Sequence, residues 1–245
     1  FLTRGPGRYG MRQVAYPRGF ERDDVQVRTH LLNASGGEPI TVTEGAALER
    51  APYRGLATFT AADADQYFGR EREVEAFVNR LRSQGFVAVV GPSGAGKSSF
   101  VQAGVVPSLP PGWRTVIVRP GATPIAAMAQ RLVADGVVAG TPDEVAAALR
   151  ADRDMLQRIL GQDRQAQAAG LLLIVDQFEE LVTLCPDPAE RNAYADAIMA
   201  VADHSAATGG NVRVIVTLRD DYLVRAEQLT PLRNRLSRGL QLLTT

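Results

Sequence analysis

Five short runs of apolar residues alternate with stretches of helical spacing along most of the chain. They cover residues 86–90, 113–119, 171–175, 211–218 and 240–243. Apolar runs of this length are typical of parallel strands that are buried on both faces. Strands that alternate with helices predict a parallel sheet with helices on both sides. We therefore expect a three-layer α/β/α fold.

The stretches between these runs carry the helical pattern. Val74, Phe77, Val78 and Leu81 are spaced i, i+3, i+4 and i+7, which places them on one face of a helix at about 70–83. Further helices are expected at 97–106, 125–134, 188–204 and 223–238, and from a capping sequence at 141–144 to about 168 with a break near 152–154.

The first 51 residues have a different texture. Short apolar runs at 11–16, 25–32 and 39–43 are separated by turns that contain Pro and Gly, a pattern that favours short strands. We expect a short β-rich N-terminal appendage, or the tail of an upstream module, over 1–51 and one α/β domain over 52–245. Because the sequence begins with Phe1 and stops at an expected strand, we also expect it to be a piece of a longer protein.

Composition narrows the classes of partner and compartment. The apolar share of 45% is enough for a core, and the formal net charge is zero, so neither nucleic acid nor an anionic membrane is an expected partner. No apolar run approaches the roughly 18 residues that a membrane span needs. Cys185 is the only cysteine, which excludes an intrachain disulfide and suits a reducing compartment. We therefore expect a cytoplasmic location.

The loop after the first predicted strand, GPSGAGKSS, fits the phosphate-binding pattern G-x-x-x-x-G-K-[ST], known as Walker A. Its residues are Gly91, Pro92, Ser93, Gly94, Ala95, Gly96, Lys97, Ser98 and Ser99. Glycines let successive backbone N–H groups wrap a polyphosphate, and the helix expected at Lys97 turns its positive end toward it. Lys97, the only lysine in the chain, supplies a charge near the β- and γ-phosphates, and the Ser98 hydroxyl can bind Mg²⁺.

A second acidic element follows the third predicted strand. The run LLLIV ends in Asp176, which places this carboxylate at the edge of the sheet where the phosphate loop also lies. Asp176 is therefore the expected partner of Mg²⁺, the Walker B role. Glu179 and Glu180 follow, and one of them can polarise the water that attacks the γ-phosphorus. Adjacent residues point in different directions, and the sequence does not decide which of the two acts.

Arg219 comes directly after the fourth predicted strand. A fixed guanidinium at this edge can contact the γ-phosphate and sense whether it is present. The alternative is an ion pair with Asp220 or Asp221, which the spacing also allows.

Five motifs together resemble the STAND class of P-loop ATPases. They are PYRGLATF at 52–59, FGRE at 68–71, GPSGAGKSS at 91–99, DQFEEL at 176–181 and VTLRDDYL at 216–223. The first of them looks most like the bacterial branch called novel STAND NTPases. The resemblance covers 52–245 and implies a sheet order of 5-1-4-3-2, ATP or ADP as ligand with Mg²⁺, and Asp176 on the metal. It further implies that Phe68, Gly69 and Arg70 lie near the adenine and that Arg219 is the sensor.

The resemblance also implies a function. It predicts a switch domain of a multidomain signalling or defence protein that binds ATP, hydrolyses it slowly and self-associates according to its nucleotide, beside flanking sensor and effector modules. Two features depart from the family pattern. Gln177 follows Asp176 where an acid is usual, so the hydrolytic carboxylate must come from Glu179 or Glu180. The helical lid expected after the core is not in the sequence.

Other nucleotide-binding classes fit less well. The loop also resembles that of guanylate kinases, so a small-molecule kinase is the main enzymatic alternative, although such an enzyme lacks DQFEEL and Arg219. A GTPase needs an [NT]-K-x-D motif, which is impossible because Lys97 is the only lysine. The non-enzymatic alternative is a nucleotide-bound scaffold that hardly turns over.

Overall fold

The computed structural model describes residues 58–244 of the 245-residue chain. The strands predicted at 11–16, 25–32 and 39–43, and with them the proposed appendage over 1–51, lie outside the described residues. The division of the chain at residue 51 therefore stays a prediction.

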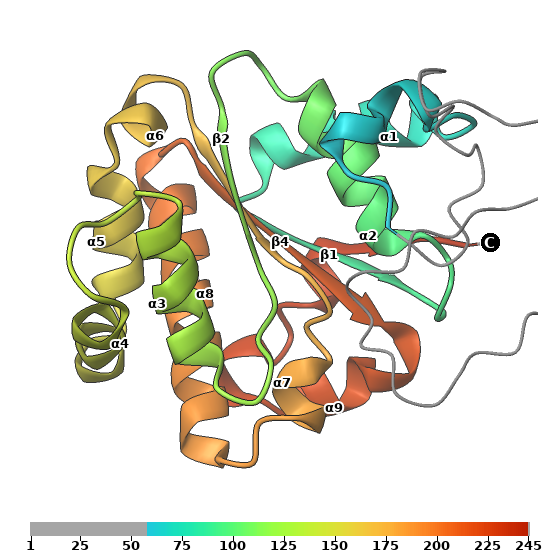
Figure 1. The fold of residues 1–245 in the computed structure, drawn as a ribbon. Coiled ribbons are helices and arrows are strands. Elements are labelled where there is room, and N and C mark those ends of the chain that lie inside the picture. Colours follow the sequence, from blue (N-terminus) through green and yellow to red (C-terminus); the bar gives the residue numbers. More distant parts are fainter. Residues whose placement is uncertain (1–57, 245) are drawn as a thin grey trace, which may run out of the picture. The chain divides into compact units, whose positions relative to one another are not determined.

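The described residues form a five-stranded sheet in the order β2-β3-β4-β1-β5, and all four neighbouring pairs are parallel (Figure 1). The strands are β1 (Phe86–Gly91), β2 (Arg114–Val118), β3 (Leu171–Val175), β4 (Val212–Arg219) and β5 (Leu240–Leu242). Read from the other edge this is the predicted order 5-1-4-3-2, so the predicted P-loop α/β fold is confirmed.

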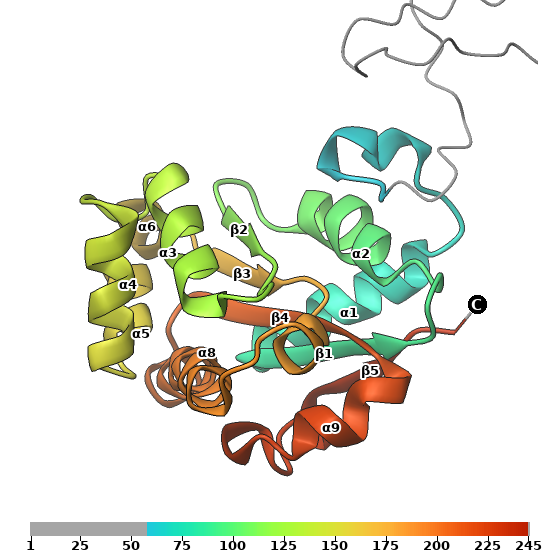
Figure 2. The ribbon, with the colours of Figure 1, turned by 60° about the horizontal axis from the view of Figure 1, so that its bottom comes forward.

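Helices cover both faces of the sheet. The α-helices are α1 (Glu71–Ser83), α2 (Lys97–Ser99), α3 (Pro124–Ala134), α4 (Pro142–Ala151), α5 (Met155–Gln162), α6 (Arg164–Ala168), α7 (Glu180–Thr183), α8 (Pro188–Thr208) and α9 (Leu223–Glu227). Figures 1 and 2 show α3 to α6 together with α8 on one side, and α1 with α2 on the other. The expected three layers are present.

Alternation along β3 shows how the sheet serves two cores. The larger core lies between the sheet and helices α3, α4, α5 and α8, and it contains Leu171, Leu173 and Val175. The smaller core lies between the sheet and α1, and it contains Leu172 and Ile174. All five side chains are fully buried. Successive side chains of a strand point to opposite faces, so a continuous apolar run fills both cores at once.

The helix after the phosphate loop changes its winding. It starts as α2, continues as a π-helix, η2 (Phe100–Val105), and ends as a 3₁₀ turn, η3 (Val106–Ser108). Gly104 allows η2 to pack tightly on α1, since a Cβ there would lie 2.7 Å from Cγ2 of Val74. The predicted helical extent to about residue 106 is confirmed, and the smaller core holds the loop's helix firmly against α1.

The helix predicted at 223–238 is wrong in length. The structure ends α9 at Glu227 and continues through 3₁₀ turns, η5 (Thr230–Leu232) and η6 (Ser237–Gly239). Pro231 cannot donate the backbone hydrogen bond that a continuing α-helix needs, and Asn234 has a left-handed backbone with φ 61°. Both residues interrupt a pattern of apolar spacing that otherwise favours a helix.

Candidate nucleotide-binding site

The phosphate loop joins β1 to α2 and depends on its glycines. Gly94 and Gly96 have φ values of 81° and 79°, which favour glycine. Gly91 packs so closely against the carbonyl oxygen of Leu243 that a Cβ would not fit. Lys97 folds back over the loop, and its Nζ donates to the carbonyl oxygens of Gly91 and Pro92, both at 2.8 Å. The ammonium group thus closes a ring of backbone around the space that the motif predicts for phosphates.

A cavity of about 300 Å³ lies beside this loop. Its lining residues come from four separate parts of the chain and are Thr58, Phe59, Ser93, Gly94, Gly96, Lys97, Ser98, Ser99, Gln177, Glu179, Thr217 and Arg219. Most of the predicted phosphate-loop residues therefore meet Glu179 and Arg219 around one space. Gly91, Pro92 and Ala95 do not line it; the first two hold Lys97 with their carbonyl groups, and Ala95 is buried.

Asp176 is the centre of a hydrogen-bond network. Its side chain is only 1% exposed. Oδ1 accepts hydrogen bonds from the Ser98 hydroxyl at 2.6 Å and the Thr217 hydroxyl at 2.7 Å. Oδ2 accepts from Nε and Nη2 of Arg119 at 3.3 and 3.2 Å. A buried carboxylate needs such partners because desolvation penalises its charge. The network joins the phosphate loop directly to the residue that follows β3, for which the sequence predicts the Walker B role.

Strand register explains why these side chains meet. Val118, Val175 and Val216 are neighbours across β2, β3 and β4. The next residues along the three strands are Arg119, Asp176 and Thr217, and in a parallel sheet such residues share a face. The preceding residues on that face, Ile117, Ile174 and Ile215, contact the smaller core. The row therefore lies on the side of α2, within reach of Ser98.

The two neighbouring glutamates have different surroundings. Glu179 lines the cavity, and its Oε2 accepts the backbone N–H of Arg219 at 3.3 Å. Burial raises the pKa of Glu179, while hydrogen bonds from backbone N–H groups and the charges of Lys97 and Arg219 act in the opposite direction. Glu180 does not line the cavity; its Oε2 accepts the N–H of Gly121 at 3.1 Å and so ties the β2–α3 loop to α7.

The cations of the site are both engaged with protein groups. Partial burial lowers the pKa of Lys97, and the charges of Glu179 and Asp220 act in the opposite direction. Arg219 lines the cavity, but its guanidinium pairs with Asp221 through two contacts of 3.0 and 2.6 Å. It also lies 5.3 Å from the centre of the Tyr222 ring. The ion pair that the sequence allowed as an alternative is therefore present.

The FGRE element lies apart from the cavity. Phe68 is 75% exposed, the N–H of Gly69 donates to Glu71, and Arg70 donates from Nη2 to the carbonyl oxygen of Thr244 at 2.9 Å. None of Phe68, Gly69 and Arg70 lines the cavity. Their predicted place near an adenine stays a prediction.

Three features of the site escaped the sequence analysis. Arg119 and Thr217 complete the Asp176 network, and the register of adjacent strand ends was the signal that could have found them. Phe59 lines the cavity, and its N–H donates to the Ser99 hydroxyl at 3.1 Å. It belongs to the PYRGLATF motif, which was noted as a resemblance without a physical role.

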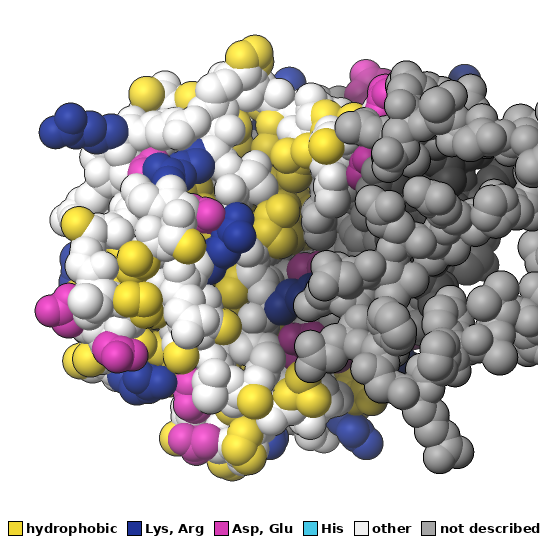
Figure 3. Space-filling view, in the orientation of Figure 1, with side chains coloured by type: hydrophobic (Ala, Val, Ile, Leu, Met, Phe, Trp, Pro, Cys, Tyr) yellow, Lys and Arg dark blue, Asp and Glu magenta, His cyan; other side chains and the backbone are white. Residues whose placement is uncertain are grey.

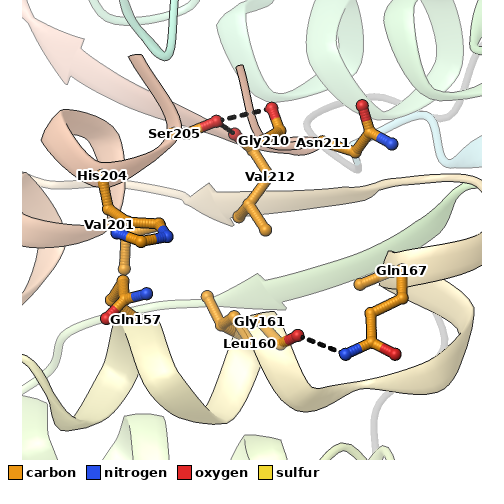
Figure 4. A pocket seen from close by; sticks show the side chains of 11 residues that line it. Gln157, Leu160, Gly161, Gln167, Val201, His204, Ser205, Gly210, Asn211 and Val212 are labelled. Atoms are coloured by element: carbon orange, nitrogen blue, oxygen red, sulfur yellow. Dashed lines mark hydrogen bonds between the residues drawn. The ribbon is translucent and has the colours of Figure 1, made fainter. Parts of the chain in front are cut away.

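A second hollow, shown in Figure 4, lies at the other end of the sheet. It is lined by residues of α5, α6, α8 and the segment 210–212 that enters β4. Its most buried polar side chain, Ser205, donates to the carbonyl oxygens of Gly210 and Val212 at 2.8 and 2.6 Å. Because backbone groups already satisfy this hydroxyl, we assign no chemistry to the hollow.

One face of the described part and the lengths of its helices bear on charged and membrane partners. On the face in Figure 3, acidic and basic side chains are interspersed over the described part. No helix among residues 58–244 is long and apolar enough to cross a membrane.

Among the solved structures that are similar to the chain are a Walker-type ATPase of Pyrococcus abyssi (12% identity, TM-score 0.47), the ORC2 protein of Aeropyrum pernix in ADPNP–ADP complexes (16%, 0.42) and a chain of the E. coli MS115-1 HORMA:CdnC:Trip13 complex (17%, 0.39). The matches cover 77%, 72% and 74% of this chain, but only 56%, 48% and 55% of the others. The chain thus spans about half the length of these structures. No curated protein sequence matches it.

One family model matches most of the chain. It describes the novel STAND NTPase 1 family, and the match covers residues 52–245. The motifs that carry the sequence resemblance lie in this range, and the sheet order agrees with the one that the resemblance implied. The chain belongs to the novel STAND NTPase 1 family and contains an NTPase-type domain with the P-loop α/β fold.

Proposed function

We propose that this chain binds ATP with Mg²⁺ in the cavity beside the phosphate loop and hydrolyses it slowly. The observation that carries the proposal is the 2.6 Å hydrogen bond between Ser98 and Asp176, which are 78 residues apart in the sequence. It joins Ser98, which lines the cavity together with Lys97 and Glu179, to the buried carboxylate of Asp176, which does not line the cavity itself. The domain would act as a nucleotide switch in a multidomain signalling or defence protein and self-associate according to its nucleotide.

Phosphates would be held by the loop and by Lys97. The ammonium group now contacts two carbonyl oxygens, which are neutral acceptors. Phosphate oxygens carry full negative charge, and charge-assisted hydrogen bonds are roughly twice as strong as neutral ones. Lys97 can therefore exchange the carbonyls of Gly91 and Pro92 for the β- and γ-phosphates with a gain in free energy.

Ser98 and Asp176 suit Mg²⁺ because both offer oxygen atoms, the ligands that this ion prefers. No group of three or more His, Cys, Asp or Glu side chains able to hold a metal ion occurs among residues 58–244. Mg²⁺ commonly takes one or two protein oxygens and completes its shell with phosphates and water. When bound, Mg²⁺ would neutralise part of the charge on the phosphates. Arg119 and Thr217 hold the Asp176 carboxylate in place.

Glu179 is the candidate base. It lines the cavity, whereas Glu180 is bound to Gly121. An acid whose pKa is raised holds a proton more readily, so Glu179 can accept the proton of an attacking water. In the hydrolytic step the water oxygen bonds to the γ-phosphorus, the bond to the β-γ bridging oxygen breaks, and ADP and inorganic phosphate leave. The proton then passes from Glu179 to solvent.

Arg219 can supply the sensor contact after a small rearrangement. Its partner Asp221 is 51% exposed, and exposed ion pairs contribute only about 0–1 kcal/mol. A γ-phosphate in the cavity would compete for the guanidinium at little cost. This exchange would make the position of Arg219 depend on the third phosphate, as a switch requires.

Slow turnover follows from the placement of the remaining arginines. Arg225 lies against Tyr222, Arg235 pairs with Asp203, and Arg233 is exposed. None of the three lines the cavity, so any of them could stabilise the phosphate charge only from a neighbouring subunit. A monomer would then lack part of the stabilising charge. We expect turnover below about 1 s⁻¹, the lower end of typical enzyme rates, that rises with protein concentration.

The test compares wild type with Lys97→Ala. Calorimetric titration with Mg·ATP should show that wild type binds the nucleotide. Lys97→Ala should weaken the free energy of binding by about 1.5–3 kcal/mol, which raises the Kd roughly 10- to 100-fold. GTP should compete more weakly than ATP. Arg238→Ala, which removes an exposed cation before β5, is the matched control and should leave the Kd unchanged. Equal affinities of wild type and Lys97→Ala would contradict the proposed site, and ATP binding without phosphate release would indicate a scaffold.

A further inference from the structure

The turn that follows β3 contains an unusual backbone. Within residues 58–244 only two non-glycine residues have positive φ, Gln177 at 55° and Asn234 at 61°. Asparagine visits this left-handed region readily, whereas a glutamine has no local hydrogen bond that compensates for the close Cβ. Strained backbone of this kind is most informative when it lies beside a functional site.

Packing and hydrogen bonds on either side force this conformation. Asp176 belongs to the side of the sheet that faces α2, and Phe178 is fully buried in the core on the opposite side. Thr217 fixes the turn between them. Its hydroxyl accepts the N–H of Gln177 at 2.9 Å, and its carbonyl oxygen accepts the N–H of Phe178 at 2.8 Å. The same hydroxyl donates to Asp176, so the position of Gln177 is locked to the Walker B carboxylate.

Gln177 itself is a lining residue of the cavity. It lines the same space as Lys97, Glu179 and Thr217. The hydroxyl of Thr217 and both oxygens of Asp176 are already engaged. In the described part of the chain the carboxamide of Gln177, in contrast, makes no hydrogen bond with any other residue. A carboxamide offers an acceptor oxygen and two N–H donors, which suits a water molecule and a phosphate oxygen at the same time.

We propose that Gln177 is a further catalytic residue that positions the attacking water against the γ-phosphate. Its carboxamide oxygen accepts a hydrogen bond from the water, and its N–H donates to a γ-phosphate oxygen. Glu179 takes the proton of the water, so Gln177 neither gains nor loses a proton in the step. A glutamine has this water-orienting role in some other nucleotide hydrolases. The inference rests on the proposed ATP hydrolysis and adds a residue at the position where the family pattern has an acid.

The inference can be tested because substitutions at Gln177 separate the effect of its strained backbone from the effect of its carboxamide. Gln177→Gly relieves the left-handed strain and removes the carboxamide. A residue with a purely structural role would leave this variant as active as wild type and at least as stable. We expect instead that kcat falls at least about tenfold, because the water loses its orientation, while the Kd for Mg·ATP stays within about twofold. Asn234→Gly is the matched control for relief of left-handed backbone strain. Its thermal unfolding midpoint should change in the same direction as that of Gln177→Gly.

A second variant keeps the test decisive if Gln177→Gly folds poorly. Gln177→Asn tolerates the left-handed backbone and keeps a carboxamide that is one methylene shorter, so we expect partial activity, between wild type and the glycine variant. Wild-type kcat in both Gln177→Gly and Gln177→Asn, with an active wild type, would overturn this inference alone. A wild type that binds ATP but releases no phosphate would overturn it together with the proposed hydrolysis. An affinity loss with unchanged kcat would assign Gln177 to ground-state binding and overturn the positioning role.

Discussion

The two ends of the sheet satisfy their buried polar groups in different ways. Where the chain enters β4, at the amino end, most acceptors are backbone carbonyls: Ser205 donates to Gly210 and Val212, and Nε of Arg213 donates to Leu81 at 2.9 Å. At the carboxyl end, the carboxylate of Asp176 is bound by side chains from three other elements. The hydrogen bonds at the entry of β4 go mainly to main-chain carbonyls, whereas the carboxylate of Asp176 is bound by side chains.

This difference indicates at which end of the sheet a ligand can displace existing hydrogen bonds. Backbone partners are fixed once the strands and helices form, so a ligand cannot displace them without local unfolding. Side-chain partners can change rotamer and be exchanged. Lys97 is intermediate, because its own side chain moves while its partners are the carbonyls of Gly91 and Pro92. The contrast predicts that substitutions at the carboxyl end change binding and rate, while substitutions at the amino end change stability.

The largest effect is expected for the two adjacent glutamates. Glu179→Gln should lower kcat at least about 100-fold, because the general base is lost, and should leave ATP binding intact. Glu180→Gln is the matched control at the next position. Its amide can still accept the N–H of Gly121, so we expect a rate within a few-fold of wild type. Single-turnover phosphate release measures both.

The reverse result would exchange the two roles. If Glu180→Gln loses hydrolysis and Glu179→Gln does not, the cavity beside the phosphate loop does not mark the catalytic carboxylate. Such an outcome would require the β2–α3 loop at Gly121 to move when nucleotide binds.

A stability effect is expected at the amino end. Ser205→Ala removes a hydroxyl that is 3% exposed and that also accepts Nη1 of Arg213 at 2.8 Å. The groups left without a partner should lower the free energy of unfolding by about 1–3 kcal/mol. The Kd for ATP and kcat should not change. Urea denaturation gives the free energy of unfolding, and a parallel titration gives the Kd for ATP. A large loss of ATP affinity would contradict the prediction that the amino end affects only stability.

Much of the fold was predictable because local and long-range signals agree. The run LLLIV predicts β3 in full, since all five residues are buried in one of two cores. Thr141 caps α4 as its sequence predicts, with its hydroxyl accepting the N–H of Glu144 at 3.3 Å. The region around α9 was not predictable, because apolar spacing continues across Pro231 while the backbone does not. In that segment the proline outweighs the periodicity.

The candidate site was predictable where a motif specifies residues and spacing together. Lys97, Ser98 and Glu179 line one cavity as expected, and Asp176 meets Ser98. Arg119 was missed because its role depends on Asp176, which is 57 residues away in the sequence. The two residues meet through the register of β2 and β3, which a single sequence does not reveal. The choice between Glu179 and Glu180 depends on the turn at Gln177, whose left-handed backbone no propensity favours.

The smallest effect concerns pH and the Glu179 carboxyl. Burial raises its pKa in the folded chain above the ordinary value of 4.5. As pH rises from this ordinary value, the unfolded chain releases the proton first and the folded chain keeps it. The folded state then binds more protons, so the free energy of unfolding falls until pH has passed the raised pKa. Glu179→Gln cannot titrate and should lack this decrease.

The same shift predicts the acid limb of the rate profile. A base must be unprotonated, so kcat/KM, which reports the free enzyme, should fall as pH drops through the raised pKa of Glu179, which lies above that of a solvated glutamate. The unfolding free energy of wild type minus that of Glu179→Gln, measured in urea from pH 4 upward, should fall in the window where kcat/KM rises. If Glu179 titrated as a solvated side chain, the difference between the two unfolding free energies would not change with pH. The cavity would then be as hydrated as the outer surface. A difference that falls together with the rise in kcat/KM would link the desolvation of this one carboxyl to both stability and hydrolysis.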